Sequence, residues 1–162
     1  MGLIFKNLML EVTRKCNMKC EHCMRGEQQD ITMNSKIIKY VLDATSEIDC
    51  LTLTGGEPSL APDAIRWVVY YLKNRGIKLG SFFCATNAAV YSEEFVKQLN
   101  ELYEYSQNKE KCALSIGNFV KLTYSDNETF NVKKEDFDRA FGPIVSGNKA
   151  DIKKEYEVKI EG

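Results

Sequence analysis

The chain has 162 residues, of which 44% are apolar and 28% charged, and its formal net charge is −1. This composition is typical of a folded globular domain, and the neutral balance argues against nucleic-acid binding by charge alone, which needs a clustered cationic surplus. The sequence has no apolar run of about 18 residues that could cross a membrane. Its start lacks a basic stretch followed by a long apolar core, so we expect no secretory signal and a cytoplasmic location.

The first third of the chain begins with a strand pattern and a polar loop. Residues 6–13 predict a strand, and a cysteine-rich loop extends from there to about Thr32. The helical spacing that follows predicts a helix with Asn34 as its N-cap, because the asparagine side chain can accept from the first backbone N–H groups. Its inner face is expected to comprise Ile37, Ile38, Val41, Leu42, Thr45 and Ile48.

Two further helices are predicted between short strands. A strand at 50–54 ends at the tetrapeptide 55–58, Gly-Gly-Glu-Pro. The next helix begins at Pro62 and ends at Gly76, because proline suits a first helical position and glycine a C-terminal stop. A strand at 77–85, a helix capped by Ser92 and a strand at 112–116 follow. The buried faces of these helices are expected to be Ala64, Ile65, Val68, Val69 and Leu72, and then Phe95, Val96, Leu99, Leu102 and Tyr103.

This alternation over residues 6–117 predicts an α/β fold, with a parallel sheet and helices outside it. After residue 117 the patterns weaken, and we expect a strand at 119–124, a short helix at 134–141 and a half-exposed strand at 156–160. No repeat, low-complexity segment or clear linker interrupts the chain. One domain over residues 1–162 is the economical interpretation.

The six cysteines form two groups. Three of them crowd into eight residues of the polar loop, with the spacing CxxxCxxC: Cys16, Cys20 and Cys23. The others lie singly on predicted strands among apolar neighbours, where a thiol is usually buried and inert. We expect this for Cys50, Cys84 and Cys112.

Three thiolates on one loop can converge on a single soft metal centre. A four-iron cluster normally takes four cysteines, so a run of three leaves one iron open for a small molecule to bind. A structural zinc ion stays open as an alternative, and it needs a fourth ligand. The chain's single histidine, His22, directly precedes Cys23, and the loop would be strained if both residues reached one tetrahedral ion.

The CxxxCxxC loop after the first predicted strand, together with Gly-Gly-Glu-Pro after the second, resembles the radical S-adenosylmethionine (SAM) superfamily. The resemblance implies a partial (β/α) barrel, here of about four to five strands where six are usual, with a [4Fe–4S] cluster in the first loop. It also implies that SAM chelates the open iron through its amino and carboxylate groups. Cys16, Cys20 and Cys23 match the cluster ligands.

The tetrapeptide matches the family segment that contacts the amino end of SAM. Gly55 and Gly56 are expected to let the backbone approach a ligand closely and adopt unusual dihedral angles. Glu57 is expected to hold the local geometry or to accept from the SAM ammonium, and Pro58 to stiffen the exit. A plain strand-to-helix turn is the alternative interpretation of this tetrapeptide alone.

The resemblance extends to four further residues. His22 takes the position before the last cysteine, which is usually aromatic and packs near the adenine. Thr86 and Asn87 resemble a common pocket-lining pair, and Ser115 resembles a residue placed near the ribose or carboxylate of SAM. Independently of the family, these residues and the two motifs lie at predicted C-terminal ends of strands or in the loops that follow, where a parallel barrel has its reactive loops.

The resemblance implies an enzyme in which the reduced cluster cleaves SAM to a 5′-deoxyadenosyl radical that abstracts hydrogen from a substrate. The substrate is a peptide, a protein or a small molecule, and a protein substrate would cover the open side of the short barrel. A flavodoxin or a ferredoxin would supply the electron. Two alternatives stay open: an activase of a glycyl-radical enzyme of the anaerobic ribonucleotide reductase type, and a non-catalytic, truncated module that binds cluster and SAM.

Overall fold

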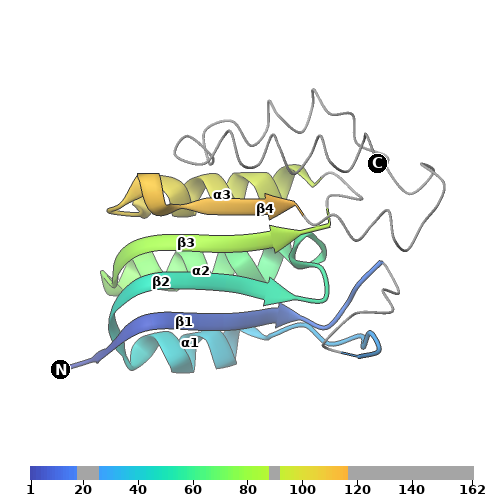
Figure 1. The fold of residues 1–162 in the computed structure, drawn as a ribbon. Coiled ribbons are helices and arrows are strands. Elements are labelled where there is room, and N and C mark those ends of the chain that lie inside the picture. Colours follow the sequence, from blue (N-terminus) through green and yellow to red (C-terminus); the bar gives the residue numbers. More distant parts are fainter. Residues whose placement is uncertain (18–25, 88–91, 117–162) are drawn as a thin grey trace.

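The computed structural model describes residues 1–17, 26–87 and 92–116 (Figure 1). Strands and helices alternate along these residues, as the sequence predicts. Two short 3₁₀ turns, η1 (Pro58–Leu60) and η2 (Lys109–Lys111), precede α2 and β4. The longer elements are β1 (Leu3–Thr13), α1 (Ser35–Asp43), β2 (Thr45–Gly55), α2 (Pro62–Arg75), β3 (Lys78–Thr86), α3 (Glu93–Tyr105) and β4 (Ala113–Ile116).

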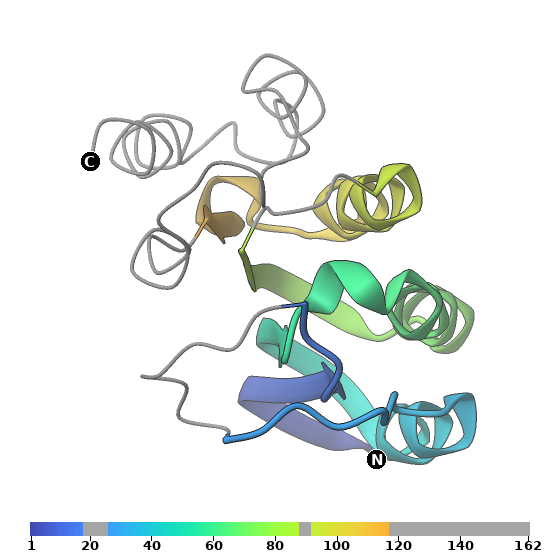
Figure 2. The ribbon, with the colours of Figure 1, turned by 90° about the vertical axis from the view of Figure 1, so that its right-hand side faces the viewer.

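The four strands form one parallel sheet in the order β1-β2-β3-β4. The three helices cover one face of it (Figures 1 and 2). A doubly wound sheet would reverse its strand order and carry helices on both faces, whereas consecutive order with helices on one face is the arrangement of a (β/α) barrel. The predicted α/β fold with a partial barrel is therefore confirmed. The elements predicted at 119–124, 134–141 and 156–160 lie outside the described residues.

The helix ends follow the capping signals in the sequence. The Asn34 side chain accepts from the backbone N–H groups of Lys36 and Ile37, at 3.0 and 3.1 Å. Gly76 ends α2 with a φ of 62°, a conformation that only glycine adopts without strain. All ten residues predicted as the inner faces of α2 and α3 are buried. None of the helices in the described part of the chain combines the length and the apolar character that a membrane crossing requires.

The prediction for the first helix was wrong at its C-terminal end. The helix ends at Asp43, and Thr45 and Ile48 belong to β2. Thr45 pairs with Leu3 of β1, and its hydroxyl donates to the carbonyl of Val41 at 2.8 Å, which helps to close the helix. The spacing of apolar residues continues to fit a helix past this point by coincidence. Pairing with another strand is a tertiary contact, and local spacing does not reveal it. Ile37, also predicted on the inner face, is 51% exposed.

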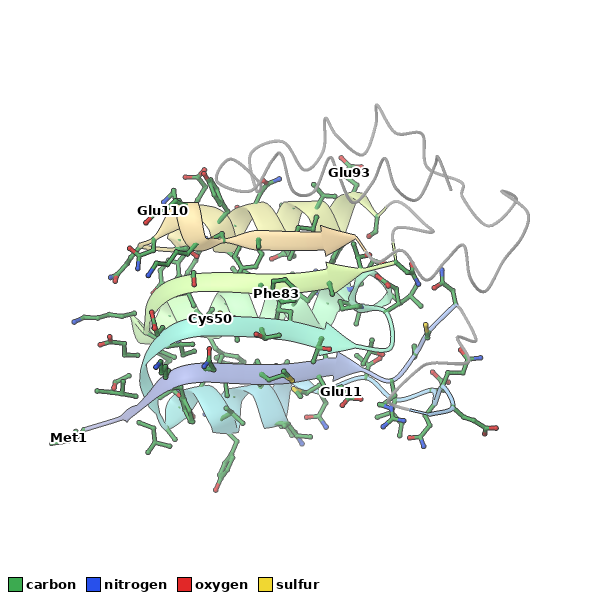
Figure 3. All side chains as sticks on the ribbon, in the orientation of Figure 1. Met1, Glu11, Cys50, Phe83, Glu93 and Glu110 are labelled. Carbon is green, nitrogen blue, oxygen red and sulfur yellow. The ribbon has the colours of Figure 1, made fainter. Side chains whose placement is uncertain are left out.

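The two faces of the sheet differ in what covers them. The side chains of Leu51, Leu53 and Phe82 point toward the helices and are fully buried. On the opposite face, Met9, Thr52 and Phe83 lie side by side on neighbouring strands, and Met9 and Phe83 are 63% and 36% exposed. Among the described residues, nothing comparable to the helix layer covers this open face (Figures 2 and 3).

The difference between the two faces of the sheet also explains why the predicted burial was wrong for one cysteine. Cys84 and Cys112 are fully buried, as predicted, but Cys50 is only half-buried. Leu51 and Leu53 face the helices, so the alternation of side chains along a strand places Cys50 on the open face (Figure 3). Its apolar neighbours in the sequence therefore belong to the other side of the strand.

Loss of side-chain volume is expected to matter on one face of the sheet only. We expect Leu51→Ala to lower the free energy of unfolding by about 2–5 kcal/mol, because it opens a cavity beneath the helices. The matched variant Met9→Ala lies on the open face and should lower it by less than about 1 kcal/mol. Urea unfolding followed by circular dichroism measures both, and equal losses would contradict a one-sided core.

Candidate functional site

The cysteine-rich loop is closed at its base by hydrogen bonds between its two ends. The Arg14 N–H donates to the carbonyl of Ile31 at 2.8 Å, and the Gln29 N–H donates to the carbonyl of Arg14 at 3.1 Å. The hydroxyl of Thr13, which is buried, also donates to the Ile31 carbonyl, at 2.9 Å. Cys16 is half-buried and leaves this base two residues after Arg14. Its backbone therefore starts from a fixed position at the end of β1.

The turn after β2 packs directly on the base of the loop. The Gly56 N–H donates to the carbonyl of Thr13, and the Glu57 N–H donates to the carbonyl of Lys15, both at 2.8 Å. Two backbone hydrogen bonds thus join the two motifs that the sequence analysis paired. The second lies immediately before Cys16.

Gly55 and Gly56 are needed because two backbone segments meet here. A Cβ atom on Gly56 would lie 2.1 Å from the carbonyl oxygen of Lys15, and one on Gly55 would lie 2.5 Å from that of Thr13. Neither glycine has a positive φ, so the structure does not use the left-handed conformation that glycine allows at these positions. The close approach that the structure shows is to the cysteine loop.

The carboxylate of Glu57 is buried and joins the ends of β2 and β3. It is 2% exposed. Its Oε1 accepts from the hydroxyl of Thr86 at 2.6 Å and from the N–H of Ser59 at 3.2 Å, and its Oε2 accepts from the N–H of Asn87 at 2.8 Å. Three donors around a buried carboxylate offset the cost of removing its charge from water. Thr86 and Asn87 are thereby brought together with the tetrapeptide, as the resemblance implies.

A further hydrogen bond connects β3 to the cysteine loop. The side-chain Nδ2 of Asn87, a buried residue, donates to Oδ1 of Asn17 at 2.8 Å. Asn17 directly follows Cys16, and the sequence analysis missed it. A polar residue in a polar loop carries no signal of its own, and only the return of β3 to the same edge of the sheet identifies it.

Burial also explains the chemistry of one strand cysteine. Desolvation, and then the nearby Glu57 carboxylate, raises the pKa of the Cys84 thiol well above its usual value. Both effects disfavour the thiolate, which is the reactive form. The prediction of an inert thiol is confirmed for Cys84 in its burial and in its electrostatic environment.

The remaining predicted residues are described in part or not at all. Ser115 lies on β4, where its Cα pairs with that of Ala85 on β3, at the same edge of the sheet as the tetrapeptide. Cys20, His22 and Cys23 lie outside the described residues. Of the three proposed metal ligands, the structure therefore places only Cys16.

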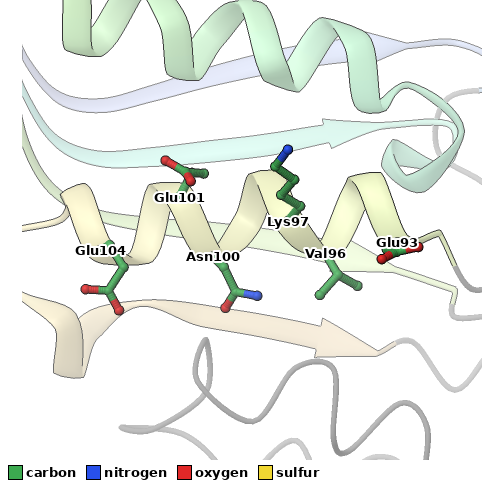
Figure 4. A pocket seen from close by; sticks show the side chains of 6 residues that line it. All are labelled: Glu93, Val96, Lys97, Asn100, Glu101 and Glu104. Atoms are coloured by element: carbon green, nitrogen blue, oxygen red, sulfur yellow. The ribbon is translucent and has the colours of Figure 1, made fainter.

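A separate hollow of about 390 Å³ runs along α3 (Figure 4). It lies on the helix layer and shares no residue with the strand-end site. Four of its six lining residues are charged, so it resembles a solvated helix surface more than a ligand pocket. The lining residues are Glu93, Val96, Lys97, Asn100, Glu101 and Glu104.

Comparison with known proteins agrees with this geometry. The family model of the radical SAM superfamily matches residues 10–107, more than half of the chain. The chain belongs to the radical SAM superfamily. Members of this superfamily use a [4Fe–4S] cluster and SAM, and the matched segment includes the cysteine loop, the tetrapeptide and the pair Thr86-Asn87.

Several curated proteins are similar to this chain. A molybdenum cofactor biosynthesis protein of Caenorhabditis elegans is 28% identical over 94% of this chain and 26% of its own length. A tungsten-containing aldehyde ferredoxin oxidoreductase cofactor-modifying protein of Pyrococcus furiosus is 33% identical over 60% of this chain and 28% of its own. Glutamate 2,3-aminomutase of Clostridioides difficile is 29% identical over 59% and 25%. The chain thus spans about a quarter of the length of these radical SAM relatives.

A solved structure agrees with the fold. Native anSMEcpe with bound AdoMet and the Cp18Cys peptide matches with a TM-score of 0.52 and 18% identity, over 97% of this chain and 42% of that chain. The TM-score supports a shared (β/α) architecture, and at 18% identity the likeness concerns the fold alone.

The described part of the site fits a thiolate-bound cluster. Cys16 lies three residues beyond the C-terminal end of β1, half-buried, and its flanking backbone is held by the tetrapeptide turn. Glycines without side chains leave room for the loop to lie directly against that turn. Soft thiolate ligands at this place suit an iron–sulfur cluster.

Gly56→Ala is expected to displace the loop. Its Cβ would overlap the Lys15 carbonyl, so the backbone before Cys16 has to move, and iron bound after anaerobic reconstitution should fall by more than half. Gly76→Ala at the end of α2 is the matched control: Gly76 has a φ of 62° and no atom of the described residues lies within 4 Å of its Cβ position, so strain of about 1 kcal/mol is expected outside the loop, with unchanged iron content. Iron and sulfide analysis measures both, and normal iron content in Gly56→Ala would contradict the close contact.

The strand cysteines are expected to differ in reactivity. Treatment of the native protein with iodoacetamide, followed by peptide mass spectrometry, should modify half-buried Cys50 and leave Cys84 and Cys112 unmodified, because burial removes access and, at Cys84, raises the pKa of the thiol. All three should react in denaturant. Labelling of native Cys84 as fast as Cys50 would contradict the packing of β3.

Proposed function

We propose that the chain binds a [4Fe–4S] cluster through Cys16, Cys20 and Cys23 and cleaves SAM reductively. The observation that supports this most directly is the junction of the two motifs: Glu57 N–H donates to the carbonyl of Lys15, directly before the first cysteine. In a member of the radical SAM superfamily, this contact brings the expected SAM-binding turn against the root of the cluster loop. Three cysteines leave one iron without a protein ligand, where the amino and carboxylate groups of SAM would bind.

Several residues receive roles from the resemblance. The tetrapeptide 55–58 would meet the amino end of SAM, with Thr86 and Asn87 lining the same pocket. Ser115 would lie near the ribose or carboxylate, and His22 would pack near the adenine. The hydrogen bonds from Thr86 and Asn87 to the Glu57 carboxylate support a shared pocket wall formed by the ends of β2 and β3.

Cys16, Cys20 and Cys23 would hold the cluster, which when bound and reduced would supply one electron for the cleavage of SAM to methionine and a 5′-deoxyadenosyl radical that removes hydrogen from the substrate. The chain's own residues would hold the cofactors and orient the reacting groups. Backbone N–H groups of Gly56 and Glu57 fix the loop base, and the buried carboxylate of Glu57 fixes the end of β3. The reacting groups would therefore meet in a prearranged geometry.

The relatives have different named activities, among them a probable GTP 3′,8-cyclase and a glutamate 2,3-aminomutase. What a family member shares with them is SAM cleavage, so this is the step we propose. The substrate is a peptide, a protein or a small molecule on the open face of the sheet, and a flavodoxin or ferredoxin supplies the electron.

Anaerobic reconstitution with iron and sulfide tests the proposal. The protein should become brown, absorb near 400 nm, and release 5′-deoxyadenosine and methionine from SAM in the presence of dithionite, as measured by liquid chromatography with mass spectrometry. Cys20→Ala should lose most of the cluster and the product, because it lacks one thiolate ligand. Cys50→Ala is the matched control and should retain both, since Cys50 lies on β2 outside the loop.

The other outcomes separate the alternatives. A loaded, reduced cluster that binds SAM and releases no 5′-deoxyadenosine would indicate a non-catalytic module. A colourless protein with about one zinc per chain would overturn the cluster assignment.

A further inference from the structure

We infer that Asn17 and Asn87 are positioning residues that, together with Glu57, hold Cys16 from both sides; this inference rests on the proposed function. Cys16 lies between Lys15 and Asn17 in the sequence. The carbonyl of Lys15 accepts from the Glu57 N–H at 2.8 Å, and Oδ1 of Asn17 accepts from Nδ2 of Asn87 at 2.8 Å. Each neighbour of the first cluster ligand is thus tied to a different strand end.

The two ties converge on one residue. The Asn87 N–H donates to Oε2 of Glu57 at 2.8 Å, so Glu57 holds Lys15 through its own N–H and Asn17 through Asn87. A closed path of hydrogen bonds and peptide bonds results, which we call the Cys16 bracket: Lys15, Cys16, Asn17, Asn87 and Glu57. Glu57 and Asn87 are 2% and 3% exposed, so water competes poorly for the bonds between them.

The bracket has a defined polarity. Asn87 uses its side-chain amide as donor toward Asn17 and its backbone N–H as donor toward Glu57. Asn17 uses only its side-chain oxygen in the bracket. An aspartate at position 17 keeps that acceptor, whereas an aspartate at position 87 removes the donor and sets an oxygen against the oxygen of Asn17.

This arrangement has a consequence for cofactor binding. The turn expected to meet SAM and the first cluster ligand belong to different strands, and the bracket ties them together. Removal of a group that orients a metal ligand typically lowers metal affinity or activity 10- to 100-fold. A single hydrogen bond through an exposed asparagine should have a smaller effect, about 5- to 10-fold on SAM affinity.

The apo-protein tests whether the bracket exists. Trypsin cleaves after lysine, and the Lys15–Cys16 bond lies inside the bracket, so its cleavage reports local opening. We expect Asn17→Ala and Asn87→Ala to accelerate cleavage at this bond at least 3-fold, with cleavage after Lys97 on α3 unchanged. Asn87→Asp should be cleaved after Lys15 as fast as Asn87→Ala, and both variants leave the sequence around the cleaved bond unchanged. Asn74→Ala, an exposed asparagine on α2, is the matched control.

The reconstituted protein tests the role of the bracket. SAM is titrated against the oxidised cluster, which supplies no electron for cleavage of SAM, and isothermal titration calorimetry gives the apparent affinity. Asn17→Ala and Asn87→Ala should each weaken SAM binding about 5- to 10-fold, the double variant should be no weaker than either single variant, and Asn17→Asp should stay within about 2-fold of the wild type.

The outcomes distinguish this inference from the proposed function. If the wild-type protein assembles no cluster on reconstitution, the proposed function is overturned, and with it the role of the bracket in SAM binding. The trypsin assay would still show whether the bracket itself exists. Wild-type protein that binds cluster and SAM, with alanine variants indistinguishable from it, would overturn the inference alone. The inference would also be overturned if the double variant weakened SAM binding by the product of the two single fold-changes. Asn17 is exposed, so its variants are expected to fold even where Asn87→Ala does not.

Discussion

The buried carboxylate of Glu57 is the interaction on which the described site depends. A buried carboxylate is stable only when hydrogen-bond donors surround it, and the N–H of Ser59, the hydroxyl of Thr86 and the N–H of Asn87 do so. These donors come from two segments that are about 30 residues apart in the sequence. The ends of β2 and β3 are therefore tied together by electrostatics as well as by the sheet.

The sheet makes this tie useful, because parallel strands in consecutive order end at one edge. The loop after β1, the turn after β2 and the end of β3 all meet there (Figure 1). The helices cover one face, so the other face, with Met9, Thr52 and Phe83, adjoins the same edge. The loops that we propose as cofactor-binding and the open face that we propose for the substrate thus lie next to each other for geometric reasons that do not depend on any single side chain.

Much of the fold could be predicted from local patterns. The caps at Asn34 and Ser92 and the stop at Gly76 mark helix ends correctly, because capping involves neighbours within a few residues. Two of the failures concern the sheet. Thr45 continued a helical period but pairs with β1, and Cys50 has apolar neighbours that face the other side of its strand.

The sequence by itself determined the chemistry: three clustered cysteines, a Gly-Gly-Glu-Pro turn, and an α/β order of elements, since residue type and spacing are local properties. Only the tertiary structure decided what Gly56 and Glu57 contact. Gly56 is small because the carbonyl of Lys15 lies where its Cβ would be, and the Glu57 carboxylate binds the end of β3. Asn17 became a site residue only when β3 returned to the same edge and Asn87 reached it. Such contacts join residues up to 70 positions apart, and the strand order that creates them is set by burial of the helix-facing core.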